Sequence, residues 1–160
     1  MDDRAVQDYY PESFAHCYGC GRLNPHGYHL RTTWDGEETV TRFTPHPYHT
    51  ALPGVVYGGV IASLVDCHGT GSAAAAALRA EGREIGQGPA PRFVTAALRV
   101  EFRRPTPLGV PLEARGRIRE MAGRKVVVEV RVLAGGEVTA TGEVVAVRVP
   151  DGPPPPDSAP

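Results

Sequence analysis

Residues 53–73 constrain the possible folds of this chain more than any other stretch. The run reads PGVVYGGVIASLVDCHGTGSA, a tight loop followed by a pattern of helical period. Four apolar residues recur at the three- and four-residue spacing that gathers side chains on one helical face: Val60, Ile61, Leu64 and Val65. We therefore predict a helix whose apolar face is covered by protein.

The opposite face of this helix should carry small residues. At about 100° per residue, it gathers Gly59, Ala62, Ser63, Asp66, Gly69, Thr70 and Ala73. A solvated helix face normally carries several charges, whereas this face carries one, Asp66. Because a lone carboxylate among small residues is costly to bury without a role, we interpret Asp66 as a candidate catalytic residue. The alternative is a polar residue with a satisfied partner.

Two glycines stand at the helix entrance. Gly58 and Gly59 leave backbone N–H groups uncovered by side chains at the positive end of the helix dipole. Such an end can hold a developing oxyanion. The alternative is that the pair forms only a turn.

The remaining pattern predicts strands on both sides of the helix. Residues 28–34 and 38–44 alternate around an Asp-Gly turn signal and predict a hairpin. The helix should end near residues 81–82. Four consecutive antiparallel strands are then expected at residues 93–104, 112–121, 125–133 and 137–149. This is an α+β architecture, a curved sheet around one helix, with a partner subunit expected to cover the small-residue face.

The turn-rich segment before the hairpin contains a metal-like spacing. Cys17 and Cys20 form C-x-x-C, and His16, His26 and His29 are nearby candidate ligands. No second C-x-x-C follows. We interpret the segment as a structural cap with a buried cysteine and expect no metal; a structural zinc and a redox pair remain alternatives.

Composition limits the class of protein. At 160 residues the chain is expected to form one domain, residues 14–149, between a flexible arm at 1–13 and a disordered proline-rich tail at 150–160. The net charge of −1 argues against a nucleic-acid partner, although residues 91–150 carry 11 basic and 6 acidic side chains. We attribute that excess to solvated strand faces or to a phosphate-bearing ligand. Three cysteines, no long apolar run and no secretory pattern favour a cytoplasmic protein without a membrane segment.

Two runs carry a resemblance to a known family. They are His49-x3-Pro53-Gly54-x2-Tyr57-Gly58-Gly59-x6-Asp66 and VTAALRVEFRRPTPLG at residues 94–109. Together they resemble the hotdog-fold acyl-CoA thioesterases of the phenylacetic-acid-degradation type, over roughly residues 14–149. The resemblance implies a hotdog fold and hydrolysis of an acyl-CoA thioester, with coenzyme A as part of the substrate and no separate cofactor. It also implies a homodimer or homotetramer.

The resemblance assigns roles to individual residues. Asp66 matches the general base or nucleophile, and Gly59, with Gly58 beside it, matches the amide donors that polarise the thioester carbonyl. Thr95 matches a threonine that orients water in the partner's site. Tyr57 departs from the family pattern, which usually has histidine there; a tyrosine can form a hydrogen bond but, with a pKa near 10, cannot replace an imidazole in proton transfer.

Thr95 does not fit simple strand alternation. Counting from its neighbours, its side chain would point away from the helix unless a bulge or the subunit seam changes its direction. An ordinary strand threonine is the alternative. Arg103 and Arg104, at the end of the same strand, could bind the phosphates of coenzyme A or simply be solvated.

Two other functions remain open. A hotdog CoA-ester dehydratase or isomerase would be favoured if His49 were the base. His49 could equally be an ordinary loop residue or shape the Pro53-Gly54 turn. A non-catalytic acyl-CoA binding protein would fit the absence of the usual histidine.

Overall fold

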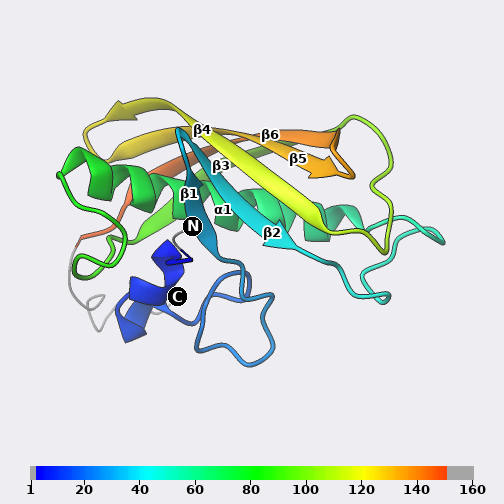
Figure 1. Cartoon of the computed structure of the whole chain (residues 1–160), viewed down its shortest axis with the longest axis horizontal. Helices are drawn as coiled ribbons and strands as arrows, with labels where there is room; N and C mark the ends of the chain where they lie inside the picture. Colours follow the sequence, from blue (N-terminus) through cyan, green and yellow to red (C-terminus); the bar gives the residue numbers. More distant parts are fainter. Residues whose placement is uncertain (1–2, 151–160) are drawn as a thin grey trace.

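A long helix, α1 (Gly58–Ala80), lies under a curved antiparallel sheet (Figure 1). The computed structural model describes residues 3–150, and within them the sheet has six strands. They are β1 (Thr32–Asp35), β2 (Glu38–Phe43), β3 (Phe93–Phe102), β4 (Leu112–Ala122), β5 (Lys125–Ala134) and β6 (Glu137–Arg148). This arrangement matches the hotdog fold. The first strand begins four residues later than expected.

The sheet order is β1-β2-β4-β5-β6-β3, so the four strands after the helix are antiparallel to their neighbours as expected, and the first of them lies at the sheet edge. β3 pairs with β6 and not with β4. The reason is the connection at residues 103–111, which contains three prolines and cannot form a tight hairpin. It crosses the helix entrance instead, where Val56 N donates to Thr106 O at 2.8 Å.

The second half of α1 is covered by its own chain. All residues from 67 to 78 are buried, and Gly69 lies so close to Val144 of β6 that a Cβ would not fit. The expectation that Gly69, Thr70 and Ala73 need a partner subunit to cover them is therefore wrong. The first half keeps five half-buried small or polar positions: Gly58, Gly59, Ala62, Ser63 and Asp66.

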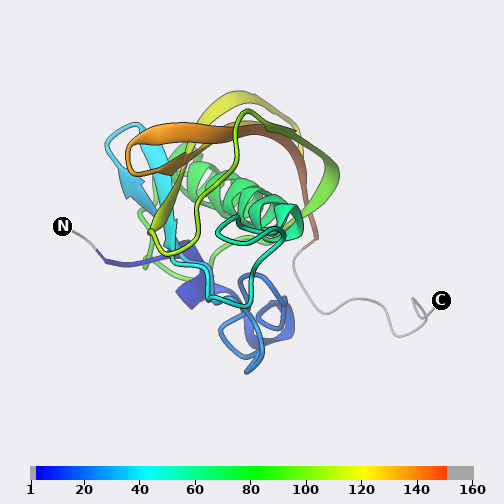
Figure 2. The same cartoon turned by 90° about the vertical axis from the view of Figure 1, so that its right-hand side faces the viewer.

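Residues before β1 cover the side of the helix that the sheet leaves open. Figure 2 shows the sheet arching over α1 and the blue N-terminal segment on the other side. A short 3-10 helix, η1 (Val6–Tyr9), is followed by another, η2 (Glu12–Phe14). Ala5, Val6, Gln7 and Tyr10 are buried, so residues 5–10 are anchored to the fold, where we expected a loosely attached arm. Of the expected disordered tail at 150–160, residues 151–160 lie outside the described residues.

Gln7 fixes this segment to the sheet. Its side-chain oxygen accepts a hydrogen bond from the Thr32 backbone amide at 2.7 Å, and its side-chain nitrogen donates one to Thr32 Oγ1 at 3.0 Å. Gly71 of α1 faces both residues so closely that a Cβ would clash.

None of the helices within residues 3–150 is long and apolar enough to cross a membrane.

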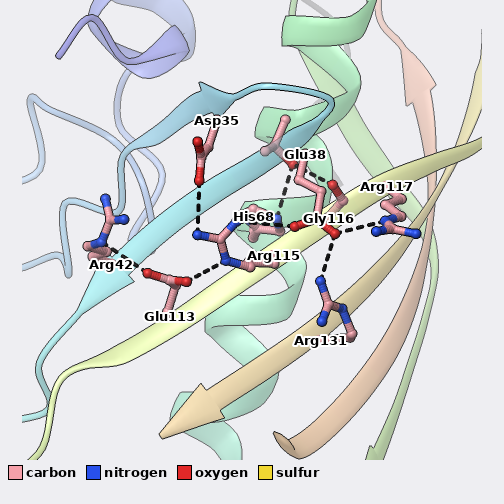
Figure 3. Close-up of polar contacts among 10 residues, drawn as sticks. Asp35, Glu38, Arg42, His68, Glu113, Arg115, Gly116, Arg117 and Arg131 are labelled. Carbon is pink, nitrogen blue, oxygen red and sulfur yellow. Dashed lines mark hydrogen bonds and ion pairs between the residues drawn. The ribbon is translucent and has the colours of Figure 1, made fainter. Parts of the chain in front are cut away.

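The outer face of the sheet carries a network of ion pairs (Figure 3). Arg115 contacts Asp35 at 3.0 Å, Glu38 at 3.1 Å and Glu113. Glu38 also pairs with arginines of β4 and β5: Arg117 and Arg131. Much of the arginine excess of the second half therefore balances acidic side chains on neighbouring strands.

Candidate active site

Asp66 and Thr95 form the central polar contact of the candidate site. The Thr95 hydroxyl donates to Asp66 Oδ1 at 2.5 Å, and both residues are half-buried. Asp66 Oδ2 has no hydrogen-bond partner within residues 3–150. One carboxylate oxygen is thus held in place, and the other is free to meet a ligand.

A β-bulge explains how Thr95 reaches the helix. The register between β3 and β6 shifts between Thr95 and Ala97, so the inward-facing set changes parity there. Phe93 and Thr95 point inward before the bulge, whereas Val100 packs against the core after it. The β-bulge that would turn Thr95 toward the helix is therefore present. Thr95 contacts the carboxylate of its own chain, whereas the resemblance placed it in a partner's site.

The helix entrance offers free backbone donors. Neither the Gly58 nor the Gly59 amide has a hydrogen-bond partner within residues 3–150, and no side chain caps α1. The Tyr57 ring lies over Gly59, leaving no room for a Cβ there. Gly58 faces the ring of Phe102, which an added Cβ would meet at 3.3 Å. An added side chain at either position would have to displace one of these two rings, both of which belong to exposed residues.

The helix entrance and Asp66 are far apart within one chain. Seven residues separate Gly59 from Asp66, which at 1.5 Å per residue is about 10 Å along the helix axis. The carbonyl group of one thioester cannot span this distance. The free amides and the carboxylate of one chain therefore cannot act on the same carbonyl group.

His49 supports the loop before the helix. Its backbone oxygen accepts a hydrogen bond from the Tyr57 amide at 2.9 Å, and its Nδ1 accepts one from the His46 amide at 2.9 Å. Its ring packs against aromatic side chains that include Tyr28 and Phe43. Partial burial, followed by the charge of His46, lowers the pKa of His49. These contacts fit the role of shaping the turn, and no contact joins His49 to Asp66 among the described residues.

Arg103 and Arg104 lie beside the helix entrance. Both help to line a surface hollow of about 500 Å³ that also includes Gly58 and Phe102. Arg103 pairs with Glu101 at 2.6 Å and Arg104 with Glu137 at 3.0 Å. These are exposed pairs, so the guanidinium groups can exchange partners at little cost.

The edge of the sheet next to the site carries exposed apolar side chains. Within residues 3–150, β3 has one neighbour, β6, and its other edge is unpaired. Three large apolar side chains along it are exposed: Val94 at 48%, Leu98 at 41% and Phe102 at 56%. An unpaired edge strand with exposed apolar groups is a typical surface for pairing with another chain.

A buried polar network centres on His68, two residues after Asp66 in α1. His68 is fully buried, with Nδ1 2.8 Å from Thr41 Oγ1 and Nε2 3.2 Å from Thr39 Oγ1. Burial lowers the pKa of His68 to about 3. Gly116 of β4 faces this ring too closely for a Cβ. The histidine therefore joins α1 to β2 as a neutral group and has no solvent access for catalysis.

The C-x-x-C segment meets a third cysteine that the sequence did not connect with it. Cys67, beside Asp66 in α1, lies with its Sγ 3.9 Å from Cys17 Sγ. The Cys20 and Cys67 side chains lower the pKa of the Cys17 thiol. His16, His26 and His29 take no part in this cluster. Separation by about fifty residues hid Cys67 from spacing arguments.

Comparison with protein-family models matches residues 53–147 to the thioesterase superfamily. The chain belongs to that superfamily. The matched region contains the helix entrance, Asp66 and Thr95. Membership supports thioester hydrolysis as the general type of reaction. A comparison with curated protein sequences finds no match.

Solved structures agree with this membership. A thioesterase superfamily protein from Shewanella loihica PV-4 is 51% identical over 79% of this chain and 96% of that one, with a TM-score of 0.64. The PaaI protein of the E. coli phenylacetic acid degradation operon is 18% identical over 77% of this chain and 81% of that one, with a TM-score of 0.61. AziG of S. sahachiroi is 19% identical over 80% of this chain and 100% of that one, also with a TM-score of 0.61. The last two show likeness of fold.

Proposed function

We propose that the protein hydrolyses an acyl-CoA thioester to a free acid and coenzyme A. The observation that carries the proposal is the 2.5 Å hydrogen bond from Thr95 to Asp66 in a chain of the thioesterase superfamily. The hydroxyl orients the carboxylate and leaves Oδ2 for the reaction. As general base, Asp66 takes a proton from water while the water oxygen attacks the carbonyl carbon. The C–S bond then breaks, and the proton passes to the departing thiolate. Direct attack by the carboxylate is the nucleophilic variant.

The carbonyl oxygen would be stabilised by the free amides of Gly58 and Gly59. They point out of the positive end of a long helix, where negative charge is favoured. Tyr57 lies over the same turn with its side chain 56% exposed, so its hydroxyl is available to a bound acyl group. We assign it a hydrogen-bonding role, which a phenolic hydroxyl can fill as donor or acceptor.

A complete site would require two chains. Asp66 and the free amides are about 10 Å apart along one helix, so a two-fold partner would have to bring its helix entrance to Asp66. The unpaired edge of β3 and its exposed Val94, Leu98 and Phe102 support pairing along that strand. We therefore propose a homodimer, or a homotetramer built from it, with shared active sites.

The substrate's nucleotide end would lie over the hollow beside the helix entrance. Arg103 and Arg104 line it, and arginine suits phosphate oxygens because its guanidinium donates two parallel hydrogen bonds. Their present carboxylate partners are exposed and easily exchanged. This position would place the thioester toward Gly58 and the phosphates toward solvent.

Thiol release from a panel of acyl-CoA esters, followed with a colour reagent, tests the proposal. The panel should include short, long and aromatic acyl groups. We expect release well above the uncatalysed rate for at least one ester. Tight binding without release would indicate a binding protein, the alternative that Tyr57 favours. Hydration of an enoyl-CoA without thiol release would indicate a dehydratase and direct attention to His49.

A further inference from the structure

Three cysteine sulfurs converge between the N-terminal segment and the middle of α1. Cys17 and Cys20 come from the turn before β1, and Cys67 comes from the helix. Their Sγ atoms all lie within 4.8 Å of one another, and this is the one such group of potential metal ligands in residues 3–150. Cys20 and Cys67 are buried at 2% and 6% exposure, and all three thiols are free.

The spacing of the sulfurs suits a tetrahedral metal. With zinc–sulfur bonds of about 2.3 Å, two thiolates on a tetrahedral zinc are roughly 3.8 Å apart. The Cys17 and Cys67 sulfurs are 3.9 Å apart. A disulfide would join two of the sulfurs and leave the third without a partner in the same pocket. A single ion uses all three.

The turn is built to bring its cysteines to the helix. Gly21 N donates to Cys17 O at 2.7 Å, which closes the C-x-x-C turn. Gly19 faces Cys67 so closely that a Cβ would overlap its sulfur, and Gly21 faces the Cys17 backbone in the same way. Glycine at both positions therefore permits the approach of the turn to α1.

Two unpaired polar groups are buried near the cluster. The Tyr10 hydroxyl and Arg92 Nη1 have no hydrogen-bond partner within the described residues, and the Arg92 guanidinium lies 4.9 Å from the Tyr10 ring. One zinc with three thiolates carries a net charge of −1. Such a centre would balance the buried guanidinium, which three neutral thiols cannot do.

We propose that Cys17, Cys20 and Cys67 bind one zinc ion through their thiolate sulfurs. Zinc is favoured over magnesium or calcium because soft thiolates select it, whereas those ions require oxygen ligands. The three thiol protons leave to solvent on binding. The ion ties residues 17–20 to α1 at the position next to Asp66, so its role is structural. The inference does not depend on the proposed function.

Metal analysis of the full chain tests the site. The protein is expressed with zinc and a reductant, purified without a metal-binding tag, and measured by mass spectrometry for zinc per chain. We expect close to one zinc, and its loss in Cys17→Ser, Cys20→Ser and Cys67→Ser. His26→Ala is the matched control, because His26 is an exposed histidine of the same segment outside the cluster, and this variant should keep the metal.

A second measurement covers the case in which the serine variants do not fold. Cobalt added to chelator-treated wild-type protein should give the intense near-ultraviolet absorption of thiolate-to-cobalt charge transfer, and zinc should restore the melting temperature that chelation lowers. Folded wild-type protein without bound zinc would overturn the proposal. A zinc content in all three serine variants equal to that of wild type would also overturn it. The same holds if alkylation of freshly isolated protein shows a disulfide within the cluster.

Discussion

The Thr95 hydroxyl donates to Asp66 Oδ1 at 2.5 Å across a separation of 29 residues. This contact joins the bulge in β3 to the middle of α1. It fixes the carboxylate without covering both of its oxygens. A hydrogen bond to a charged group contributes about 1.5–3 kcal/mol, so losing it should affect turnover measurably.

Thr95→Val removes the hydroxyl and keeps the shape of the side chain. We expect kcat/KM to fall roughly 10- to 100-fold, since 1.4 kcal/mol corresponds to one factor of ten. Thr95→Ser keeps the hydroxyl and should stay within several-fold of wild type. Steady-state kinetics with one acyl-CoA measures both. Equal activity of the valine and serine variants would show that the contact is structural only.

The shared site predicts that assembly and activity are lost together. Leu98→Asp places a charge on the exposed edge of β3 and should shift the protein toward monomer in light scattering at micromolar concentration. Activity per chain should fall with the dimer fraction. Met121→Glu changes an exposed apolar residue of β4, 46% exposed, and should alter neither property. A fully active monomer would contradict a site built from two chains.

The arginine pair predicts a difference between two substrates. Replacing Arg103 and Arg104 with alanine should raise KM for acyl-CoA and weaken its dependence on salt. Hydrolysis of an acyl-pantetheine thioester, which lacks the nucleotide, should be nearly unchanged. Equal losses on both substrates would mean that the pair supports the fold or the chemistry and does not anchor phosphate.

His68 predicts loss of stability in acid. Its pKa is about 3 in the folded protein because of burial, against about 6.5 when unfolded. Below pH 6.5 the unfolded chain binds a proton that the folded chain does not, so this contribution is complete above pH 6.5 and declines as the pH falls toward 3. Between pH 6.5 and 5 it amounts to roughly 2 kcal/mol. Urea unfolding measures the change, and His68→Gln should reduce it. The same pH dependence in both proteins would assign the effect to other groups.

Local pattern was enough to predict most elements. Helical spacing placed α1 within a residue or two of its observed bounds, and alternation with glycine turns located β4, β5 and β6. These signals involve residues close in sequence. The partner of β3 was not predictable in this way, because the pairing with β6 depends on how the proline-rich crossover at 103–111 passes the helix.

The candidate site was predicted in part. Asp66 was evident as the one charge among small residues, and its contact with Thr95 required a bulge that sequence alternation does not reveal. The proximity of Cys67 to Cys17 and Cys20 was not predicted, because these two cysteines lie about fifty residues earlier in the sequence. The anchoring of residues 5–10 was not predicted because the N-terminal segment is mostly polar, although Val6, Tyr9 and Tyr10 have the spacing of one helical face.

Comparison of wild-type protein with Asp66→Asn in the acyl-CoA thiol-release assay tests the central claim most directly. Asparagine keeps the shape and can still meet Thr95, but it cannot take a proton or attack the carbonyl. We predict a loss of kcat of at least ~10²-fold, with the melting temperature and the oligomeric state unchanged. A folded Asp66→Asn variant that keeps most of its activity would contradict the account and move the chemistry away from Asp66.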